Sequence, residues 1–538
     1  MNDIDIAHGV QLRSIFDVSD GIGIDRANVI NYGAYKAKVR YDSKVPNNGN
    51  LILVTAINPT PLGEGKTTVS IGIADALRKL GKKSILSLRE PSLGPVFGMK
   101  GGATGGGFSQ IVPMEDINLH FTGDFAAIEA CNNLLCAAVD NHIYQGNELR
   151  IKDVLVTRCL DVNDRSLRSI SYGDVDSSFV ITAASEIMAL FCLANSFEDL
   201  RARLGNIVVG IDYDNNYVFA RQLGIVGSLL ALLKDAFNPN LVQTLEGTPC
   251  FVHGGPFANI AHGCSSVVSL KTALNYGEYV ITEAGFGADL GAEKFFDITC
   301  RSSGLNPSAV VIVATIRALK YNGGVSKEHV LLRNAEALQK GFDILEVHID
   351  NIKRFNSNII VCLNKFDSDY EDEVVIVEEL CKSIGADFAL STAYMDGGIG
   401  AIDVAKKIIN LDNSSKLSLL YNNDMSIIDK INSICVNVYR ADSVNYSDIA
   451  IERISELEKN NFSNLPICVA KTQYSLSDNS NNVGITTGFS VTVSDVKLYN
   501  GAGFITVYLG NILTMPGLPK EANYLNIDIV DDEIVGIK

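Results

Sequence analysis

The sequence predicts an α/β fold: a large, P-loop-type doubly wound parallel sheet accompanied by two smaller domains, one α/β and the other α+β. Three observations lead to this prediction. Apolar runs typical of buried strands alternate with helical segments, a glycine-rich loop follows one of the first strands, and the composition changes near residue 415. Such alternation is typical of βαβ units, whose strands are parallel.

The first βαβ unit lies near the N-terminus. The run 51–56 predicts a buried strand, a helix is expected from about Lys66 to Leu80, and the run 83–88 predicts the second strand. Further strand-like runs lie at Ile207–Ile211, Tyr279–Thr282, Val310–Ala314 and Ile359–Leu363, and a helix is expected over Glu328–Lys340. This order of elements indicates a doubly wound sheet.

The chain is predicted to form three domains, which span residues 1–345, 346–450 and 451–538. Beyond about residue 415, Asn and Ser become frequent, and Asp478–Asn482 has the composition of an exposed loop. The alternating runs Phe489–Val493 and Phe504–Tyr508 predict antiparallel strands. A smaller α+β domain is therefore expected at the C-terminal end.

The composition excludes several classes of protein. The 538 residues include 45 Lys and Arg against 62 Asp and Glu, a net charge of −17 with neutral His, which argues against nucleic-acid or anionic-membrane partners. The N-terminus lacks the apolar run of a signal peptide, and the most apolar stretch, Gly224–Leu233, is far shorter than the ~20 residues of a membrane span. The eleven cysteines include no C-x-x-C pair, which favours buried thiols in a reducing compartment. We therefore expect a soluble, cytoplasmic protein.

The strongest local motif is the run Thr60–Thr68, between a predicted strand and a predicted helix. The helix N-terminus offers free N–H groups to an anion, Lys66 is expected to reach the outer phosphates, and the Thr67 hydroxyl is a candidate Mg²⁺ ligand. The motif is a variant, because Thr60 stands where the strict pattern has its first glycine. It predicts that a nucleoside triphosphate is bound by Thr60, Pro61, Leu62, Gly63, Glu64, Gly65, Lys66 and Thr67.

A second candidate cation is Arg89, directly after the strand 83–88. At the carboxyl end of a parallel strand it would face the crevice where ligands bind, and its planar guanidinium suits a carboxylate or a phosphate. The alternative is an ion pair with Glu90 or another surface acid. The glycine-rich run Gly101–Gly107 is expected to be a ligand-side loop and not a regular element.

Two further motifs suggest different chemistry. Asn364-Lys365-Phe366-Asp367 matches the N-K-x-D pattern that reads guanine, so a P-loop GTPase is an alternative function. It lies roughly 300 residues from Lys66, which is long for the single compact domain of a GTPase switch. His253 and His262 flank a Gly-Gly-Pro run that forbids a helix, which disfavours a metal pair and favours a structural or substrate-side loop.

Long blocks of this sequence resemble the formate–tetrahydrofolate ligase family, also called formyltetrahydrofolate synthetases. They follow the family's order over essentially the whole chain: Thr60–Thr68, Arg89–Pro95, Val112–Asp124, Asn240–Glu246, His253–His262, Glu283–Phe296 and Met515–Lys520. The resemblance implies an ATP-dependent ligase that joins formate to N10 of tetrahydrofolate through formyl phosphate, giving 10-formyltetrahydrofolate, ADP and phosphate. A catalytically inactive nucleotide- or folate-binding scaffold is the non-enzymatic alternative.

The resemblance also implies roles for single residues. Lys66 and Arg89 would be catalytic, with Arg89 holding formyl phosphate, and Phe366 and Tyr394 would be the two rings that stack on folate. The family has Trp where Tyr394 stands, and this chain contains no Trp; Tyr offers a smaller stacking face. The loop after Lys520 also departs from the family, which often has another proline there.

The resemblance implies further properties. The first predicted domain would hold nucleotide and formyl phosphate, and the second would contact folate. Mg²⁺ with ATP, K⁺ or ammonium as a monovalent cation, and a homotetrameric assembly are implied as well.

Overall fold

A computed structural model describes residues 2–46, 48–61, 63–99, 103–172, 175–258, 260–412, 415–510, 512–531 and 533–537. Its largest sheet has the strand order β1-β2-β14-β15-β4-β16-β3-β17-β18-β19. In that order the strands span Val29–Asn31, Ala37–Val39, Asn240–Thr244, Pro249–Val252, Ser84–Leu88, Tyr279–Glu283, Asn50–Ala56, Ala309–Ala314, Ile359–Asn364 and Asp387–Ser391. Neighbouring strands are parallel in the part of the sheet that runs β15-β4-β16-β3-β17-β18-β19. The strands β1, β2, β14 and β15 form an antiparallel edge. The predicted α/β fold with a large, mainly parallel sheet is confirmed.

Alternating side chains of the central strands fill two separate cores. Leu51 and Leu53 of β3 enter the core on one face of the sheet, whereas Ile52 and Val54 enter the core on the other. The first core is covered by α10 (Val267–Tyr276), α12 (Ile316–Asn322), α13 (Ala335–Lys353) and α14 (Glu371–Ser383). The second is covered by α3 (Lys66–Lys79) and α16 (Ile402–Asn410). A strand with two buried faces has the continuous apolar sequence that predicted it.

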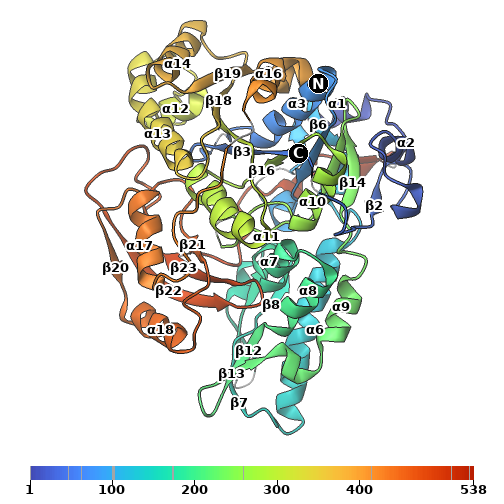
Figure 1. Ribbon diagram of the computed structural model, residues 1–538, viewed down its shortest axis with the longest axis vertical. Coiled ribbons are helices and arrows are strands. Elements are labelled where there is room, and N and C mark those ends of the chain that lie inside the picture. Colours follow the sequence, from blue (N-terminus) through green and yellow to red (C-terminus); the bar gives the residue numbers. More distant parts are fainter. Residues whose placement is uncertain are drawn as a thin grey trace.

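A second lobe, made of helices, lies below the sheet in Figure 1. Its core joins α6 (Asp124–Tyr144), α7 (Glu186–Leu193), α8 (Phe197–Gly205) and α9 (Val226–Leu233). A small antiparallel sheet of β7 (Ile151–Val154), β12 (Val208–Asp212) and β13 (Tyr217–Phe219) packs beside them. The run Ile207–Ile211, expected in the doubly wound sheet, therefore corresponds to β12 in this separate sheet.

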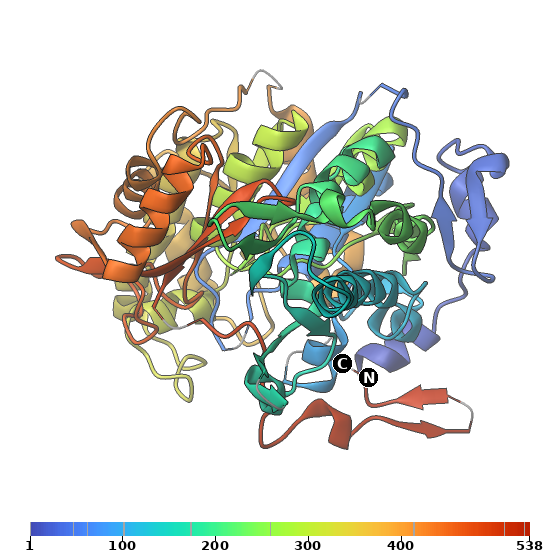
Figure 2. The same cartoon turned by 90° about the horizontal axis from the view of Figure 1, so that it is seen from below.

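The C-terminal lobe has a sheet of its own, with the order β20-β22-β23-β21. Strands β22 (Ser490–Tyr499) and β23 (Phe504–Leu509) are antiparallel, as the alternating runs predicted. Strands β20 (Ser443–Tyr446) and β21 (Ile467–Ala470) pair with them in parallel, and α17 (Ile427–Asn437) and α18 (Asp448–Lys459) lie against the sheet. At the end of the chain, the hairpin of β24 (Asp528–Val530) and β25 (Glu533–Val535) projects from the body close to the N-terminus (Figure 2).

Two local predictions differ from the structure. The helix expected over Glu328–Lys340 begins only at Ala335, because the Asn334 side chain accepts the Ala337 amide and caps the first turn. In the run Gly101–Gly107, Gly105–Gly106 form a short strand, β5, paired with β6 (Ser109–Val112). Gly101 and Gly102 lie outside the described residues.

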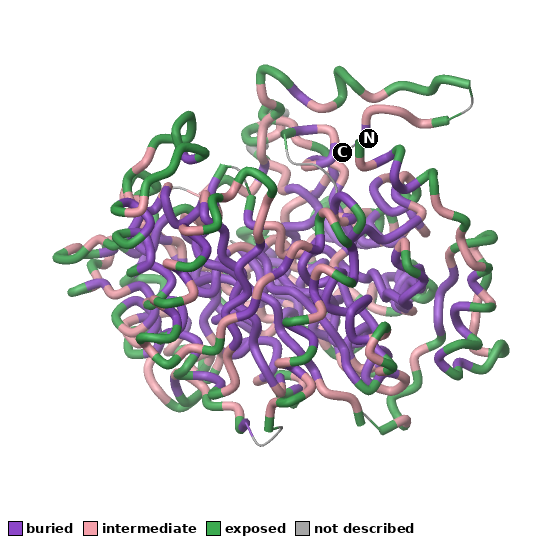
Figure 3. Tube along the Cα trace, turned by 90° about the horizontal axis from the view of Figure 1, so that it is seen from above, coloured by how far each residue is buried: buried purple, intermediate pink, exposed green. Residues whose placement is uncertain are grey.

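The three-domain division stays a prediction. Its first boundary, after residue 345, falls inside α13, and β18 and β19 beyond that boundary belong to the large sheet. The buried residues run continuously through the middle of the molecule (Figure 3). Every helix in the described part of the chain is too short or too polar to cross a lipid bilayer.

Candidate active site

The loop between β3 and α3 is shaped for close approach of a ligand. Gly63 and Gly65 have φ of +75° and +74°, in the left-handed region that residues with a side chain rarely adopt. Gly65 caps α3 without a side-chain hydrogen bond, so the first-turn amides of the helix keep their capacity to bind an anion. Within the loop, the buried Glu64 accepts the Thr60 amide at 2.6 Å through Oε1. Leu62, one of the predicted nucleotide contacts, lies outside the described residues.

The acid at the end of the neighbouring strand β16 was missed by the sequence analysis. Glu283 is buried, and its Oε2 accepts the Thr67 hydroxyl at 2.8 Å. Its Oε1 lies 3.8 Å from a guanidinium nitrogen of Arg89. The signals in the sequence are that the acid directly ends an apolar strand and that it begins the block Glu283–Phe296. One carboxylate thus contacts both Thr67, in the first turn of α3, and the second predicted cation, Arg89.

Arg89 lies where the sequence placed it, just after the carboxyl end of β4. Its Nη1 donates to the carbonyl oxygen of Pro256 at 3.3 Å, and its buried Nε has no hydrogen-bond partner among the described residues. Among the described residues, Arg89 forms its ion pair with Glu283 and not with Glu90. A buried guanidinium N–H without a partner is a donor that an anionic ligand can use.

The loop that begins at His253 and ends at His262 includes Pro256, whose carbonyl oxygen accepts the Arg89 hydrogen bond. His253 lies within 2.6 Å of Ser266 Oγ and 2.7 Å of the Ala236 carbonyl oxygen, and burial lowers its pKa to about 4. Burial also lowers the pKa of His262 to about 3. No group of three or more His, Cys, Asp or Glu residues is arranged to hold a metal ion in the described ranges.

Lys66, the first residue of α3, is half-buried beside this cluster. Burial lowers the pKa of its ammonium, Glu64 and Glu283 raise that pKa, and Arg89 lowers it again. The positive charges of Lys66 and Arg89 therefore repel each other, and the negative charge of Glu283 attracts both. Such a cluster favours an anionic ligand that neutralises the cations.

The N-K-x-D segment lies beside the phosphate loop, although it is far away along the chain. Asn364 ends β18 and its Nδ2 donates to the Glu64 carbonyl oxygen, a hydrogen bond of 3.1 Å that spans 300 residues. The two motifs therefore lie close together in space, although 300 residues separate Asn364 from Glu64 in the sequence. The Asn364 side chain thus holds the loop between β3 and α3 through a hydrogen bond.

The two rings expected to stack on folate have different neighbours. The guanidinium carbon of Arg317, on α12, lies 3.5 Å from the ring centroid of Phe366. Tyr394, on the short helix α15 (Ala393–Asp396), is 41% exposed, and its hydroxyl donates to Asp3 Oδ1 at 3.3 Å. A side chain at Gly107 would collide with the Tyr394 carbonyl oxygen at 2.0 Å, so the glycine-rich run lies directly against this residue.

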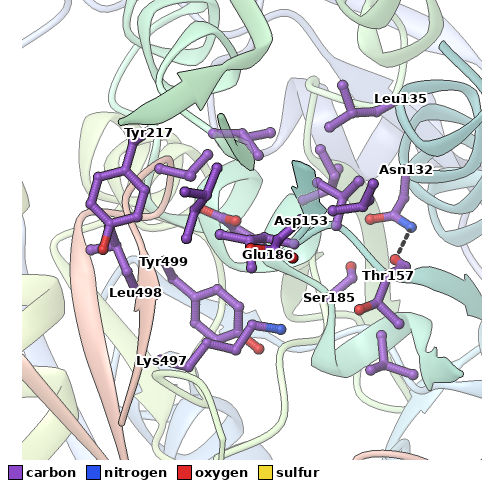
Figure 4. A pocket seen from close by; sticks show the side chains of 18 of the residues that line it. Asn132, Leu135, Asp153, Thr157, Ser185, Glu186, Tyr217, Lys497, Leu498 and Tyr499 are labelled. Atoms are coloured by element: carbon purple, nitrogen blue, oxygen red, sulfur yellow. Dashed lines mark hydrogen bonds between the residues drawn. The ribbon is translucent and has the colours of Figure 1, made fainter. Parts of the chain in front are cut away.

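A cavity of about 500 Å³ lies elsewhere, between the helical lobe and the C-terminal lobe (Figure 4). Glu186, Tyr217, Lys497 and Tyr499 are among the residues that line it. Among the described residues that line the cavity, none is predicted to bind nucleotide, formate or folate. The phosphate loop, Arg89 and this cavity are therefore separate features of the molecule.

A comparison with protein families matches the whole chain. The family model described as formate–tetrahydrofolate ligase covers residues 1–538.

Proposed function

This chain belongs to the formate–tetrahydrofolate ligase family and is therefore a ligase, and we propose that it activates formate as formyl phosphate at the expense of ATP and then formylates N10 of tetrahydrofolate. The products would be 10-formyltetrahydrofolate, ADP and phosphate. The observation that carries the proposal is the meeting of Thr67, Arg89 and Glu283 at the carboxyl ends of neighbouring parallel strands. Ligands of open α/β sheets bind at this edge.

Activation of formate is needed because oxide is a poor leaving group. A formate oxygen would attack the γ-phosphorus of ATP, the bond from that phosphorus to its bridging oxygen would break, and ADP would leave. Lys66 would stabilise the negative charge on the transferred group, and Arg89 would hold formate and then formyl phosphate. The unpartnered Nε of Arg89 supports this role, because an anion would satisfy it.

The nucleotide residues fit Mg²⁺ as the companion of ATP. Magnesium prefers oxygen ligands and usually takes only one or two from the protein, with phosphate and water supplying the rest. The Thr67 hydroxyl and the Glu283 carboxylate, 2.8 Å apart, form such a pair of donors. Mg²⁺ would neutralise phosphate charge when bound. Thr67 would hold it, and Glu283 would orient the Thr67 hydroxyl.

The second step transfers the formyl group. The N10 lone pair would attack the formyl carbon, the carbon–oxygen bond to phosphate would break, and the N10 proton would pass to solvent. N10 is aniline-like and uncharged at neutral pH, so positioning matters more than a strong base. Phe366 and Tyr394 are proposed to supply that positioning by stacking, and the 41% exposure of Tyr394 leaves its ring accessible.

The test of this function is product formation by the full chain. Protein, ATP, Mg²⁺, formate and tetrahydrofolate are mixed and then acidified, and the absorbance of the methenyl derivative is recorded. We expect product with the parent and none with Lys66→Ala. Lys79→Ala is the matched control, because Lys79 lies on the same helix but pairs with Glu246. An absence of product from correctly folded parent would favour the inactive scaffold, and competition by GTP stronger than by ATP would favour the GTPase.

The folate contact has a test of its own. Tyr394→Trp restores the residue that the family has at this position, and its larger ring should lower the KM for tetrahydrofolate by about threefold to tenfold. The KM for ATP should not change. An unchanged KM for tetrahydrofolate would remove Tyr394 from the folate site. The monovalent cation, the homotetramer and the cytoplasmic location stay predictions.

A further inference from the structure

The cavity between the helical and C-terminal lobes has the size of a small-molecule site. Its volume is about 500 Å³, within the range of roughly 300–1,000 Å³ that is usual for ligand pockets. It is bordered by α6, α7, β7 and β12 on one side and by α18 and β22 on the other. Because two lobes form its walls, a ligand bound there would contact both.

Most of the wall is apolar. Aliphatic side chains come from both lobes, among them Val154, Val156, Ile187, Val208, Leu457 and Leu498. Such a surface favours an apolar body on any molecule that enters.

Five charged side chains interrupt the apolar wall, and three of them already have partners: Asp153 with Lys152, Glu456 with the Tyr217 hydroxyl and Arg453 with Asp495. Glu186 and Lys497 are the other two. In Figure 4, Glu186 lies near the centre of the view, and Tyr499 and Lys497 lie below it. Glu186 Oε1 accepts the Gly501 amide at 2.7 Å, which fixes the carboxylate in place. Burial raises the pKa of Glu186 to about 7, and the Gly501 amide and the Lys497 charge oppose that shift.

Lys497 is a cation without a polar partner. Its ammonium lies 5.2 Å from the centroid of the Tyr499 ring, and it has no hydrogen bond or ion pair within the described ranges. The other basic residue of the wall, Arg453, is already paired with Asp495. The ammonium of Lys497 can therefore bind an anionic group of a ligand.

We propose that this cavity is a binding site for an amino acid with an apolar side chain. Lys497 would bind the carboxylate of the zwitterion, Glu186 would accept its ammonium, and the aliphatic wall would take the side chain. A simple carboxylate would place a second negative charge beside Glu186, and a simple amine would leave Lys497 unpaired. A ligand with both charges satisfies both groups.

The test uses L-leucine and L-phenylalanine as probes, with isothermal titration calorimetry on the full chain in the absence of nucleotide. 4-Methylpentanoate and isopentylamine are the matched analogues, because each keeps the apolar body of leucine and lacks one of its charges. We expect saturable binding at one site for at least one amino acid. Each analogue should bind at least about tenfold more weakly, the usual effect of losing a charge-assisted hydrogen bond.

Two variants identify the charged groups. Lys497→Met should weaken binding of the amino acid about tenfold or more and abolish its advantage over isopentylamine. Glu186→Gln keeps an acceptor for the Gly501 amide and should abolish the advantage over 4-methylpentanoate. Lys459→Met is the control, since Lys459 is an exposed lysine at the end of α18 and does not line the cavity.

Three results would overturn the proposal. They are no saturable binding of either amino acid, equal affinity for leucine and one of its truncated analogues, and equal affinity of the Lys497→Met and Lys459→Met proteins. None of these measurements needs ATP, formate or tetrahydrofolate. Failure here therefore leaves the proposed ligase reaction untouched, and failure of that reaction leaves this site untouched.

Discussion

Arg89 is held on one side by the Pro256 carbonyl oxygen and on the other by Glu283, with one buried N–H left over. If this N–H binds formate, Arg89→Met should raise the KM for formate by at least about tenfold, because a charged hydrogen bond is worth about 1.5–3 kcal/mol. The KM for ATP should change much less.

The control for Arg89 is Arg26→Met, which removes an exposed guanidinium that pairs with Asp20 at 2.6 Å. Its formate kinetics should equal those of the parent. Steady-state initial rates at varied formate concentration give the KM for formate of each protein. An Arg89→Met enzyme with the KM of the parent would show that Arg89 does not contact formate.

Asp75 is a buried acid in the middle of α3, where its Oδ1 accepts the Thr244 hydroxyl at 2.7 Å. Burial raises its pKa from 3.8 to about 7, so the native state holds this proton over a range of pH in which the unfolded chain has lost it. The free energy of unfolding should therefore fall with rising pH in this window, by up to about 1.4 kcal/mol per pH unit.

Asp75→Asn removes this titration and keeps the acceptor for Thr244. The variant should equal the parent below about pH 4 and exceed it in stability increasingly up to about pH 7. Urea unfolding of both proteins at several pH values measures the difference, in which all other titrating groups cancel. A difference that does not depend on pH would contradict the prediction.

Lys66 and Thr67 could be predicted as nucleotide-binding residues from local sequence, because the strand, the loop and the helix that position them are consecutive in the chain. It could not identify Glu283 or Asn364 as their neighbours. Glu283 Oε2 and Thr67 Oγ1 are 216 residues apart in sequence, and their contact depends on β16 pairing with β3. Strand order is set by the packing of whole elements, which a single sequence does not reveal.

At the scale of elements, the two-faced burial of the central strands explains why they were predictable. A continuous apolar run such as 51–56 has few alternatives to a strand inside a parallel sheet. The run Ile207–Ile211 has the same composition, but β12 pairs with β7 and β13 in antiparallel fashion. An apolar composition predicts that a strand is buried, but it does not predict to which sheet the strand belongs.

Helix α3 presses against α15 through a glycine. A Cβ at Gly72 would lie 2.4 Å from the Cβ of Ala393, closer than two carbon atoms can approach. Gly72→Ala should therefore lower the free energy of unfolding by about 1–3 kcal/mol, although alanine is the better helix former. It should also raise the KM for tetrahydrofolate, because α15 carries Tyr394.

A second helical glycine provides the matched control for Gly72. Gly227 in α9 is exposed, and a Cβ there would meet nothing within 4 Å. Gly227→Ala should stabilise the protein by up to about 1 kcal/mol. Chemical unfolding of the two variants should give changes of opposite sign; changes of the same sign would show that the α3–α15 contact is looser than the Gly72 distances indicate.

At the scale of the whole molecule, one edge of the large sheet gathers side chains from distant parts of the chain. The ends of β3, β4, β16 and β18 contribute the loop that leads to Lys66, and Arg89, Glu283 and Asn364. The net charge of −17 repels anionic substrates at long range, so the two cations gathered here must act locally.

A buried ion pair ties the C-terminal lobe to that edge. Lys471, just after β21, lies 2.8 Å from Asp289 Oδ2, and both side chains are fully buried. Asp289 Oδ1 in turn accepts Nδ2 of Asn58, the second residue after β3 on the way to the phosphate loop, at 3.2 Å. The C-terminal lobe therefore supports the start of this loop through two successive polar contacts.

Removing one partner of a buried pair leaves a buried charge without compensation. Lys471→Met should lower the free energy of unfolding by about 3–5 kcal/mol, and addition of Asp289→Asn should recover part of that loss. The exposed pair of Arg150 and Asp214, 2.5 Å apart, is the control, and Arg150→Met should cost less than about 1 kcal/mol. Urea unfolding measures all three, and the KM for ATP reports on the loop. If Lys471→Met cost no more than Arg150→Met, the pair would not hold the C-terminal lobe to the sheet.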